Sequence, residues 1–155
     1  MERIGWDDYF MELAQVALKR SSCLRRQCGA ILVKNNHVIA TGYNGTSAGL
    51  EHCDKVGCLR EQSKIPSGQR SEICRGAHAE ENTIVQAALS GISTEGSTLY
   101  TTFTPCTHCA KMIINAKIKR VVCIGNYPDD LGIKLLKEAG IQLDTLKQKA
   151  QKPND

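Results

Sequence analysis

Two short segments of the sequence carry residue types that bind metals and move protons. They are His78-Ala79-Glu80 and Pro105-Cys106-Thr107-His108-Cys109. One imidazole and two thiolates can hold a zinc ion and leave its fourth tetrahedral position open for water. Glu80 is not needed as a ligand, so its carboxylate is free to act as a general acid and base on that water. We therefore predict a hydrolytic zinc site with the ligands His78, Cys106 and Cys109.

The spacing within each segment sets a condition on this site. Cys106 and Cys109, at i and i+3, lie on one face of the first turn of a helix, where the helix dipole favours thiolates. In a regular helix His78 and Glu80 would point about 200° apart. Both can serve one pocket only if His78 occupies the helix cap, outside regular helical geometry, and we expect it there.

A non-catalytic zinc-binding module is the alternative from a different functional class. In such a module Cys106, Cys109 and the upstream cysteines would only hold structure. Glu80 distinguishes the two readings, because a structural site has no use for a proton shuttle. We expect Glu81 elsewhere on the helix surface and His108 to be a spacer, not a ligand.

The rest of the chain must position these segments. Apolar periodicity predicts a first helix over 6–20, and two β-rich runs around Asn35-Asn36 predict a hairpin over 29–34 and 37–43. Further helices are expected over 78–90, 105–115 and 131–139, with strands over 97–102, 120–125 and 141–143. This order predicts an α/β fold, a three-layer α-β-α sandwich with a mixed five-stranded sheet.

Composition fits one soluble domain over 1–155. The net charge of +4 is compatible with a small anionic substrate and too weak to argue for nucleic acid. No run of eighteen apolar residues is present, so no membrane span is expected. The acidic N-terminus has no apolar signal region, and we expect a cytoplasmic protein. The basic stretch at the end predicts a flexible tail over 147–155.

Eight cysteines are too many to ignore in a chain without a visible secretion signal. Cys28 and Cys123 lie in apolar, strand-like runs and are expected in the core. The remaining four thiols would suit a second metal, with His52 as a substitute ligand. Such a metal would fasten the long aperiodic segment 44–75; alternatively, the thiols are simply reduced and buried. These four cysteines are Cys23, Cys53, Cys58 and Cys74.

The pattern His-x-Glu…Pro-Cys-x-x-Cys resembles the signature of zinc-dependent nucleobase deaminases. Four further segments narrow the resemblance to deoxycytidylate (dCMP) deaminases, from about Trp6 to Tyr127. The resemblance implies a cytidine deaminase-like fold and hydrolysis of dCMP to dUMP and ammonia, which feeds dTMP synthesis. Position 28 departs from the family, which usually has a small aliphatic residue there. The four segments are Lys19-Arg20-Ser21, 28–33, 42–46 and 78–82.

The segment Gly42-Tyr43-Asn44-Gly45 is the most discriminating part of this resemblance. Gly42 and Gly45 would let the backbone approach a ligand closely. The Asn44 amide can both donate and accept hydrogen bonds, and the resemblance implies that it binds the deoxyribose. A tight turn after a strand is the plainer reading of the same residues.

A nucleoside monophosphate also requires cations in the site. We predict that Arg25 and Arg26, just before the first strand, bind the phosphate, with Lys19 as a reserve. Tyr127, after the strand over 120–125, is predicted to form part of the pocket wall.

The resemblance also implies properties that no residue pattern reveals. These are a structural zinc near segment 44–75, a homo-hexamer, activation by dCTP and inhibition by dTTP, with Mg²⁺ accompanying the bound effector. Rival readings on the same fold are a tRNA adenosine, free-base or riboflavin-pathway deaminase. A tRNA enzyme should show a strongly basic face, and a single-strand DNA editor should show stacking aromatics. The mild net charge of +4 argues against the first of these, and the aromatic content of 5% argues against the second.

Overall fold

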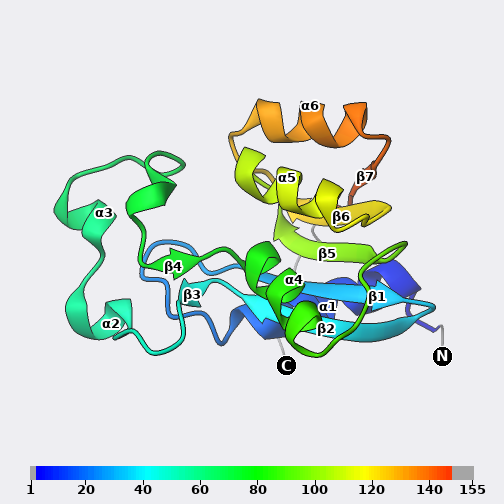
Figure 1. Cartoon of the computed structure of the whole chain (residues 1–155), viewed down its shortest axis with the longest axis horizontal. Coiled ribbons are helices and arrows are strands. Elements are labelled where there is room, and N and C mark those ends of the chain that lie inside the picture. The colour runs from blue at the N-terminus through cyan, green and yellow to red at the C-terminus, as the bar shows by residue number, and fades with distance from the viewer. Residues whose placement is uncertain (1–2, 148–155) are drawn as a thin grey trace, which may run out of the picture.

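A mixed five-stranded sheet forms the middle of the molecule, with its strands in the order β2-β1-β5-β6-β7 (Figure 1). β1 is antiparallel to both β2 and β5, whereas β5, β6 and β7 run parallel. The computed structural model describes residues 3–147, so nearly all of the predicted tail lies outside the described residues. The strands are β1 (Gly29–Lys34), β2 (His37–Tyr43), β5 (Thr98–Phe103), β6 (Arg120–Gly125) and β7 (Gln142–Thr145).

Helices cover both faces of this sheet. Because side chains alternate along a strand, Ile31 and Val33 of β1 pack with α1, and Ala30 and Leu32 enter the core on the opposite face. The predicted three-layer α/β fold with a mixed five-stranded sheet is therefore confirmed. The helices are α1 (Trp6–Leu18) on one face, and α4 (Ala79–Leu89), α5 (Thr107–Asn115) and α6 (Asp130–Glu138) on the other.

The β1–β2 hairpin turns where the sequence predicts it. Asn35 and Asn36 have φ angles of 51° and 58°, the left-handed values that a tight two-residue hairpin loop requires and that asparagine tolerates. Differences at other boundaries are small. The first helix ends at Leu18, and the last strand begins after Ile141, which is itself buried.

An ion-pair cluster attaches the start of α1 to the sheet. Arg120 donates to both carboxylate oxygens of Asp7, at 2.9 and 2.8 Å, and its Nε donates to Asp144 at 2.7 Å. The Tyr100 hydroxyl also donates to Asp7. The Arg120 hydrogen bonds hold the pKa of Asp7 below its usual value, against the opposing effect of burial.

The segment between β2 and α4 extends away from the sheet, past the ends of β1 and β2 (Figure 1). Its ends are held together by β3 and β4, which pair antiparallel through Gly45–Ala77 and Thr46–Gly76. The helices within it have four residues or fewer, too short to be stable alone. We refer to residues 44–75 as the insertion. Its elements are β3 (Gly45–Thr46), α2 (Cys53–Val56), α3 (Leu59–Gln62) and the 3₁₀ turn η1 (Ser71–Ile73), with β4 (Gly76–Ala77) following.

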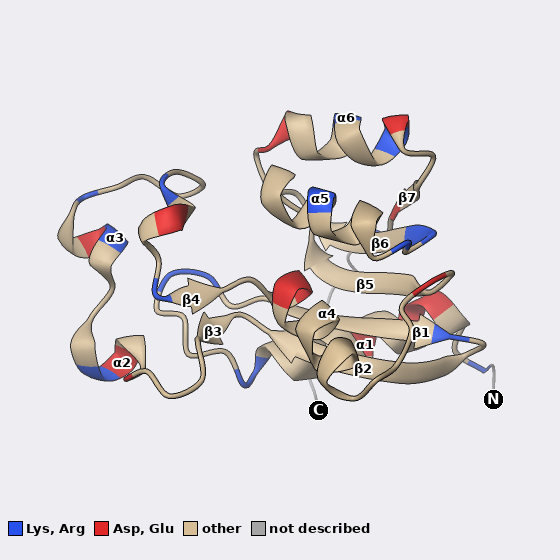
Figure 2. Cartoon of the chain, in the orientation of Figure 1, with Lys and Arg blue, Asp and Glu red and all other residues tan. Residues whose placement is uncertain are grey.

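Charged residues of both signs are spread over the fold. Figure 2 shows acidic and basic residues together on α2, α3 and α6, and basic residues on the loop that passes beside β4. Within residues 3–147 no helix has both the length and the apolar character needed to cross a bilayer.

Candidate metal and catalytic site

The N-termini of α4 and α5 bring the predicted donors together. His78 is the N-cap of α4, with extended backbone angles of φ −75° and ψ 160°, so the expected cap position is confirmed. Cys106 is the N-cap of α5, with φ −71° and ψ 169°. This non-helical geometry lets His78 and Glu80 reach one pocket, which two residues of a regular helix could not do.

The three donor atoms have the spacing that zinc requires. Nδ1 of His78 lies 3.3 Å from Sγ of Cys109 and 3.4 Å from Sγ of Cys106. Zinc bonds to nitrogen and sulfur, meeting at a tetrahedral angle, would separate such atoms by about 3.6 Å. Within residues 3–147 this is the only group of three or more His, Cys, Asp or Glu side chains whose donor atoms all lie within 4.8 Å of one another. The donor set therefore fits a zinc ion.

The pKa values of the three donor groups are strongly shifted from their usual values. The hydrogen bond from Cys109 and that with His78 lower the pKa of Cys106 to about 4, against the effect of burial. The Cys106 partner raises the pKa of His78 to about 9. Donation to Cys106, together with burial, raises the pKa of Cys109. The pocket thus favours the thiolate form of Cys106, which is the form in which a cysteine binds a metal.

Glu80 is a buried carboxylate beside these donors. Thr101 of β5 donates its hydroxyl proton to Oε1 of Glu80 at 2.9 Å, and Oε2 lies 3.7 Å from Sγ of Cys109. Burial raises the pKa of Glu80, which makes the carboxylate a better proton acceptor than an exposed glutamate. The contribution of Thr101 was missed in the sequence, because one threonine in a strand gives no signal of its partner.

Glu81 lies outside the donor group and the cavity lining, as expected, but it makes two contacts that the sequence did not indicate. Its Oε2 accepts a hydrogen bond from the backbone N–H of His78 at 2.5 Å, and its Oε1 lies 2.8 Å from Nε2 of His108. The physical reason is its place at the third position of α4, where a carboxylate reaches back to the cap residue. His108 is exposed and outside the donor group, as expected.

The sequence predicted that Gly42 lets the backbone approach a ligand, and the structure shows a different role for it. A Cβ at Gly42 would lie 2.3 Å from Oγ1 of Thr83 and 2.7 Å from the carbonyl oxygen of Ala79. The close approach is therefore that of β2 to α4. Gly45 does line the cavity beside the donors, although a Cβ there would first meet Oγ of Ser22, at 2.9 Å.

Asn44 lines the same cavity and also fixes the loop before β1. Its Oδ1 accepts hydrogen bonds from Oγ of Ser21 at 2.6 Å and from the backbone N–H of Cys28 at 2.7 Å. Its Nδ2 donates to the carbonyl oxygen of Arg26 at 2.7 Å. The amide thus holds the segment that carries the predicted phosphate ligands, and its predicted contact with a deoxyribose stays a prediction.

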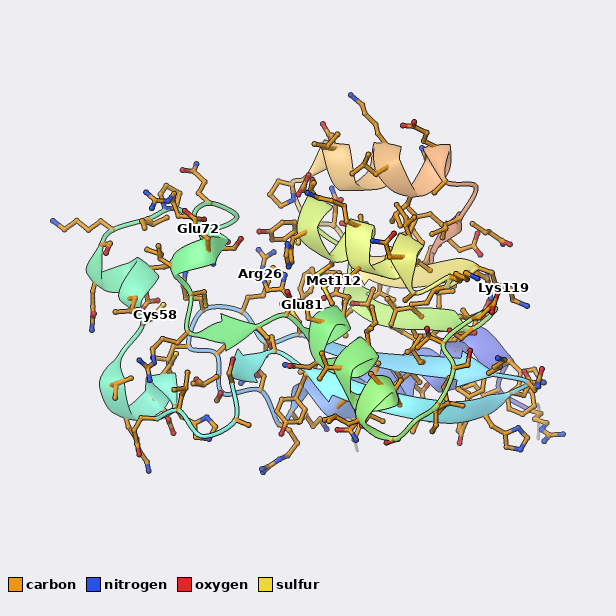
Figure 3. All side chains as sticks on the ribbon, viewed as in Figure 1. Arg26, Cys58, Glu72, Glu81, Met112 and Lys119 are labelled. Atoms are coloured by element: carbon orange, nitrogen blue, oxygen red, sulfur yellow. The ribbon has the colours of Figure 1, made fainter. Side chains whose placement is uncertain are left out.

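Arg25, Arg26 and Tyr127 all line the cavity. The guanidinium carbon of Arg26 lies 4.8 Å from the ring centroid of Phe103 and 5.8 Å from that of Tyr127, and Figure 3 shows Arg26 between the insertion and the rest of the domain. The Nη1 atoms of Arg25 and Arg26 are buried without a hydrogen-bond partner among the described residues. Lys19 is exposed and does not line the cavity.

Arg60 is a third cationic residue of the cavity, and no pattern in the sequence indicated it. It comes from α3 in the aperiodic insertion, and its Nη2 donates to the carbonyl oxygen of Pro66 at 3.4 Å. Its Nε is buried and has no hydrogen-bond partner among the described residues. Buried donors without partners are costly, so these guanidinium groups are suited to receive an anion.

The four cysteines predicted to hold a second metal all line the cavity, but they are not gathered into a donor cluster. Sγ of Cys53 lies 3.7 Å from Oγ1 of Thr46. His52, the substitute ligand, is exposed, with Nδ1 3.3 Å from Oγ of Ser22. The four are Cys23, Cys53, Cys58 and Cys74.

The other two cysteines differ from each other. Cys123 is fully buried in β6, as predicted. Cys28 is partly buried: it packs against the core cluster, in keeping with the prediction, and it also lines the cavity. It precedes β1, where the chain has not yet entered the sheet. Burial, followed by the charge of Glu80, raises the pKa of the Cys28 thiol to about 12, which keeps it protonated and unreactive.

Comparisons with known proteins agree with this geometry. Residues 4–125 match the family model described as the cytidine and deoxycytidylate deaminase zinc-binding region. Deoxycytidylate deaminase of Schizosaccharomyces pombe is 42% identical over 142 residues, which are 91% of this chain but 44% of that protein. Deoxycytidylate deaminase of Mycobacterium phage D29 is 37% identical over 135 residues, covering 84% of this chain and 99% of the phage protein.

A solved structure is similar over nearly the whole chain. The dCMP deaminase of cyanophage S-TIM5, in complex with dCMP and dUMP, has a TM-score of 0.79 and 31% identity, and the match covers 94% of this chain and 100% of the phage chain. The present chain thus spans less than half of the yeast relative but all of the phage structure. Together with the family match over most of its length, these similarities show that the chain belongs to the cytidine and deoxycytidylate deaminase family.

Proposed function

We propose that this protein catalyses the hydrolytic deamination of dCMP to dUMP and ammonia, a step that feeds dTMP synthesis. The observation that carries the proposal is the arrangement of His78, Cys106 and Cys109 at zinc-ligand spacing beside the buried carboxylate of Glu80. The same cavity holds buried guanidinium nitrogens that have no partner among the described residues, as a phosphorylated substrate requires. The similarity to a dCMP deaminase solved with dCMP and dUMP also supports it.

Zinc held by His78, Cys106 and Cys109 would supply a Lewis acid that lowers the pKa of a coordinated water toward neutrality. Glu80 would accept one proton of the attacking water and deliver it to the ring nitrogen next to the amine-bearing carbon. The water oxygen bonds to that carbon, the C–N bond breaks, and Glu80 passes the second proton to the departing ammonia. Thr101 donates to Oε1 of Glu80, and Oε2 faces the metal donors, so we assign the proton transfer to Oε2.

Phosphate recognition is assigned to Arg26, with Arg25 and Arg60 beside it. The rings of Phe103 and Tyr127 orient the Arg26 guanidinium, which limits the entropy lost when it binds an anion. Nη1 of Arg26 and Arg25, and Nε of Arg60, are the buried donors that a phosphate would satisfy. Tyr127 additionally forms part of the cavity wall.

The deoxyribose is assigned to Asn44. Its Oδ1 already accepts two hydrogen bonds and its Nδ2 donates one. An amide nitrogen has two protons, so the second is the one that reaches a sugar hydroxyl. The three internal bonds hold the amide in one orientation and so prepare it for that contact.

The second zinc remains part of the proposal, with Cys23, Cys53, Cys58 and Cys74 as ligands and His52 as a substitute. Its support is that all four thiols line one cavity wall around the insertion, whose short helices need an additional constraint. Binding would require the thiols to move toward one another, since their sulfurs are not yet gathered. Eight free cysteines fit a reducing compartment, and we propose a cytoplasmic location.

The support for a proposed assembly and regulation is the resemblance of residues 42–46 and 78–82 to dCMP deaminases. We propose a homo-hexamer activated by dCTP and inhibited by dTTP, with Mg²⁺ bound to the effector phosphates. Light scattering with and without each nucleotide measures the assembly, and initial rates with each nucleotide measure the regulation. A monomer whose rate is unaffected by either nucleotide would refute this part alone.

The test of the main proposal is an ammonia-release assay on dCMP, dCTP, deoxycytidine and tRNA, with and without dCTP and dTTP as effectors. We expect turnover of dCMP well above that of deoxycytidine, because the arginines of the cavity would bind the phosphate of dCMP, which deoxycytidine lacks. Preferred turnover of tRNA would favour an adenosine deaminase on the same fold. Zinc-loaded protein that deaminates none of the four would favour a structural zinc module.

A further inference from the structure

One carboxylate outside the cavity contacts both segments that carry the metal donors. Glu81 of α4 accepts the backbone N–H of His78 at 2.5 Å through Oε2, and its Oε1 lies 2.8 Å from Nε2 of His108. His108 stands in the first turn of α5, between Cys106 and Cys109 in the sequence. In Figure 3 Glu81 is labelled at the N-terminal end of α4. A single side chain thus connects the two helix N-termini that must meet around the metal.

The donor set depends on the backbone that Glu81 holds. His78 reaches the site only from its extended cap conformation, and its backbone N–H needs an acceptor there. The Oε2 atom of Glu81 is that acceptor, and a negative charge in the first turn of a helix is also electrostatically favourable. The imidazole of His108 donates to Oε1 from the neighbouring helix, whether it is neutral with a proton on Nε2 or doubly protonated.

We propose that the Glu81–His108 pair is a positioning device for the metal centre, which fixes the separation of the two donor segments and slows the loss of zinc. Neither residue is among those that line the cavity, so the pair acts through His78 and the two thiols and not on the substrate. The inference rests on the zinc chemistry of the proposed function. Groups that hydrogen-bond to metal ligands in this way typically change metal affinity about 10- to 100-fold.

The exposure of the pair separates this role from a general contribution to stability. The His108 side chain is 65% exposed and that of Glu81 is 19% exposed. Partly exposed ion pairs contribute little to the free energy of unfolding. A positioning role therefore predicts a large change in zinc retention and a small change in the thermal stability of the metal-free protein.

The experiment measures the rate of zinc release to a chromophoric chelator, together with kcat and KM for dCMP. Glu81→Ala should release zinc about 10- to 100-fold faster, and His108→Ala should release it faster by a smaller factor. The double variant should match Glu81→Ala, because His108 acts through Glu81. In all three kcat should fall while KM stays unchanged.

Two conservative variants and one control complete the test. Glu81→Gln and His108→Gln should release zinc nearly at the wild-type rate, because an amide oxygen can still accept from His78 and an amide nitrogen can still donate to Glu81. Glu95→Ala is the matched control. It removes an exposed ion pair outside the site, in which Nζ of Lys117 lies 3.3 Å from Oε1 of Glu95. It should leave zinc release unchanged.

Wild-type zinc release in both alanine variants would overturn the inference, and so would equal acceleration by Glu95→Ala. Single effects that add independently in the double variant would also overturn it, since the two residues would then not act as a pair. Because His108 is exposed, His108→Ala gives a folded variant even where Glu81→Ala does not. Zinc release needs no substrate, so failure of this inference is distinguishable from failure of the proposed deamination.

Discussion

The metal centre lies at the N-termini of α4 and α5, where both helices pack on the sheet, whereas the insertion extends past the ends of the strands and contains helices of only four residues (Figure 1). Both contribute to one cavity. In the metal centre three donor atoms already lie within 4.8 Å of one another. In the insertion and the loop facing it, four thiols remain apart, and buried guanidinium nitrogens have no partner within residues 3–147.

The difference shows which parts of the site folding can complete by itself. At the metal centre, sheet packing and helix caps set the positions of His78, Glu80 and Cys109, so the chemistry is preorganised. The helices of the insertion have four residues or fewer, so they are too short to be stable alone. On the function proposed above, its cations and thiols would gain their partners from the anionic substrate and the second metal.

The strongest test of the preorganised half is Glu80→Gln, which keeps the shape of the side chain and its bond with Thr101 but removes the proton acceptor. We expect kcat for dCMP to fall by at least about 10²- to 10⁴-fold, the usual contribution of general acid–base catalysis. Zinc content, measured by mass spectrometry, should stay at the wild-type value. Glu81→Gln is the control. It replaces the neighbouring glutamate in the same way and should still deaminate dCMP. Normal turnover of dCMP by Glu80→Gln would refute the proposed mechanism.

The next test removes a thiol from the insertion. Cys58→Ser should reduce the zinc content from two ions to one per chain and speed trypsin cleavage within residues 53–70, because the metal constraint on the loop is lost. The catalytic zinc should remain. Cys28→Ala is the control, a cavity thiol without a metal role, and should retain both ions. Fully active wild-type protein with one zinc per chain would rule out the second site.

Arg26→Ala tests substrate recognition from the other side of the cavity. The loss of a charge-assisted hydrogen bond to phosphate, about 1.5–3 kcal/mol, should raise KM for dCMP by about 10- to 100-fold. Activity on deoxycytidine, which has no phosphate, should barely change. Lys111→Ala removes an exposed charge on α5 and should leave both substrates unaffected. Equal losses on dCMP and deoxycytidine would show that Arg26 serves structure and not the phosphate.

The smallest effect concerns the attachment of α1 to the sheet. Because the Arg120 bonds hold the pKa of Asp7 below 3.8 in the folded state, the pair contributes stability above that value and loses it as pH falls through the lower folded pKa. Asp7→Asn should therefore lower Tm by a constant amount near neutral pH, and the difference should shrink below pH 3.8. Calorimetry of both proteins across this range measures it. A difference that persists in strong acid would contradict the assignment.

Most of the fold and the centre of the site could be predicted from local signals. Asn35-Asn36 marked the hairpin, and the spacing of His78, Glu80 and the two thiols required the cap conformation that the structure has. Each of these signals lies in a few adjacent residues. Their physical cause, a turn or a helix terminus, is equally local.

Contacts between distant segments gave no such signal. Glu81 meets His108 only because α4 and α5 pack together, and Gly42 meets Thr83 only because β2 crosses under α4. Arg60 reaches the cavity through an insertion without periodicity. Which of the many polar residues on a surface will face one another is decided by tertiary packing, so these roles required the structure.

The two-residue pairing of β3 with β4 has a consequence for how this scaffold can be altered. Gly45–Ala77 and Thr46–Gly76 close the neck of the insertion immediately before His78. Since the entropy of closing a loop grows only slowly with its length, a change in the length of the segment between positions 47 and 75 should cost the rest of the fold little. The pairing would still hold Ala77, and with it the start of α4, beside Gly45.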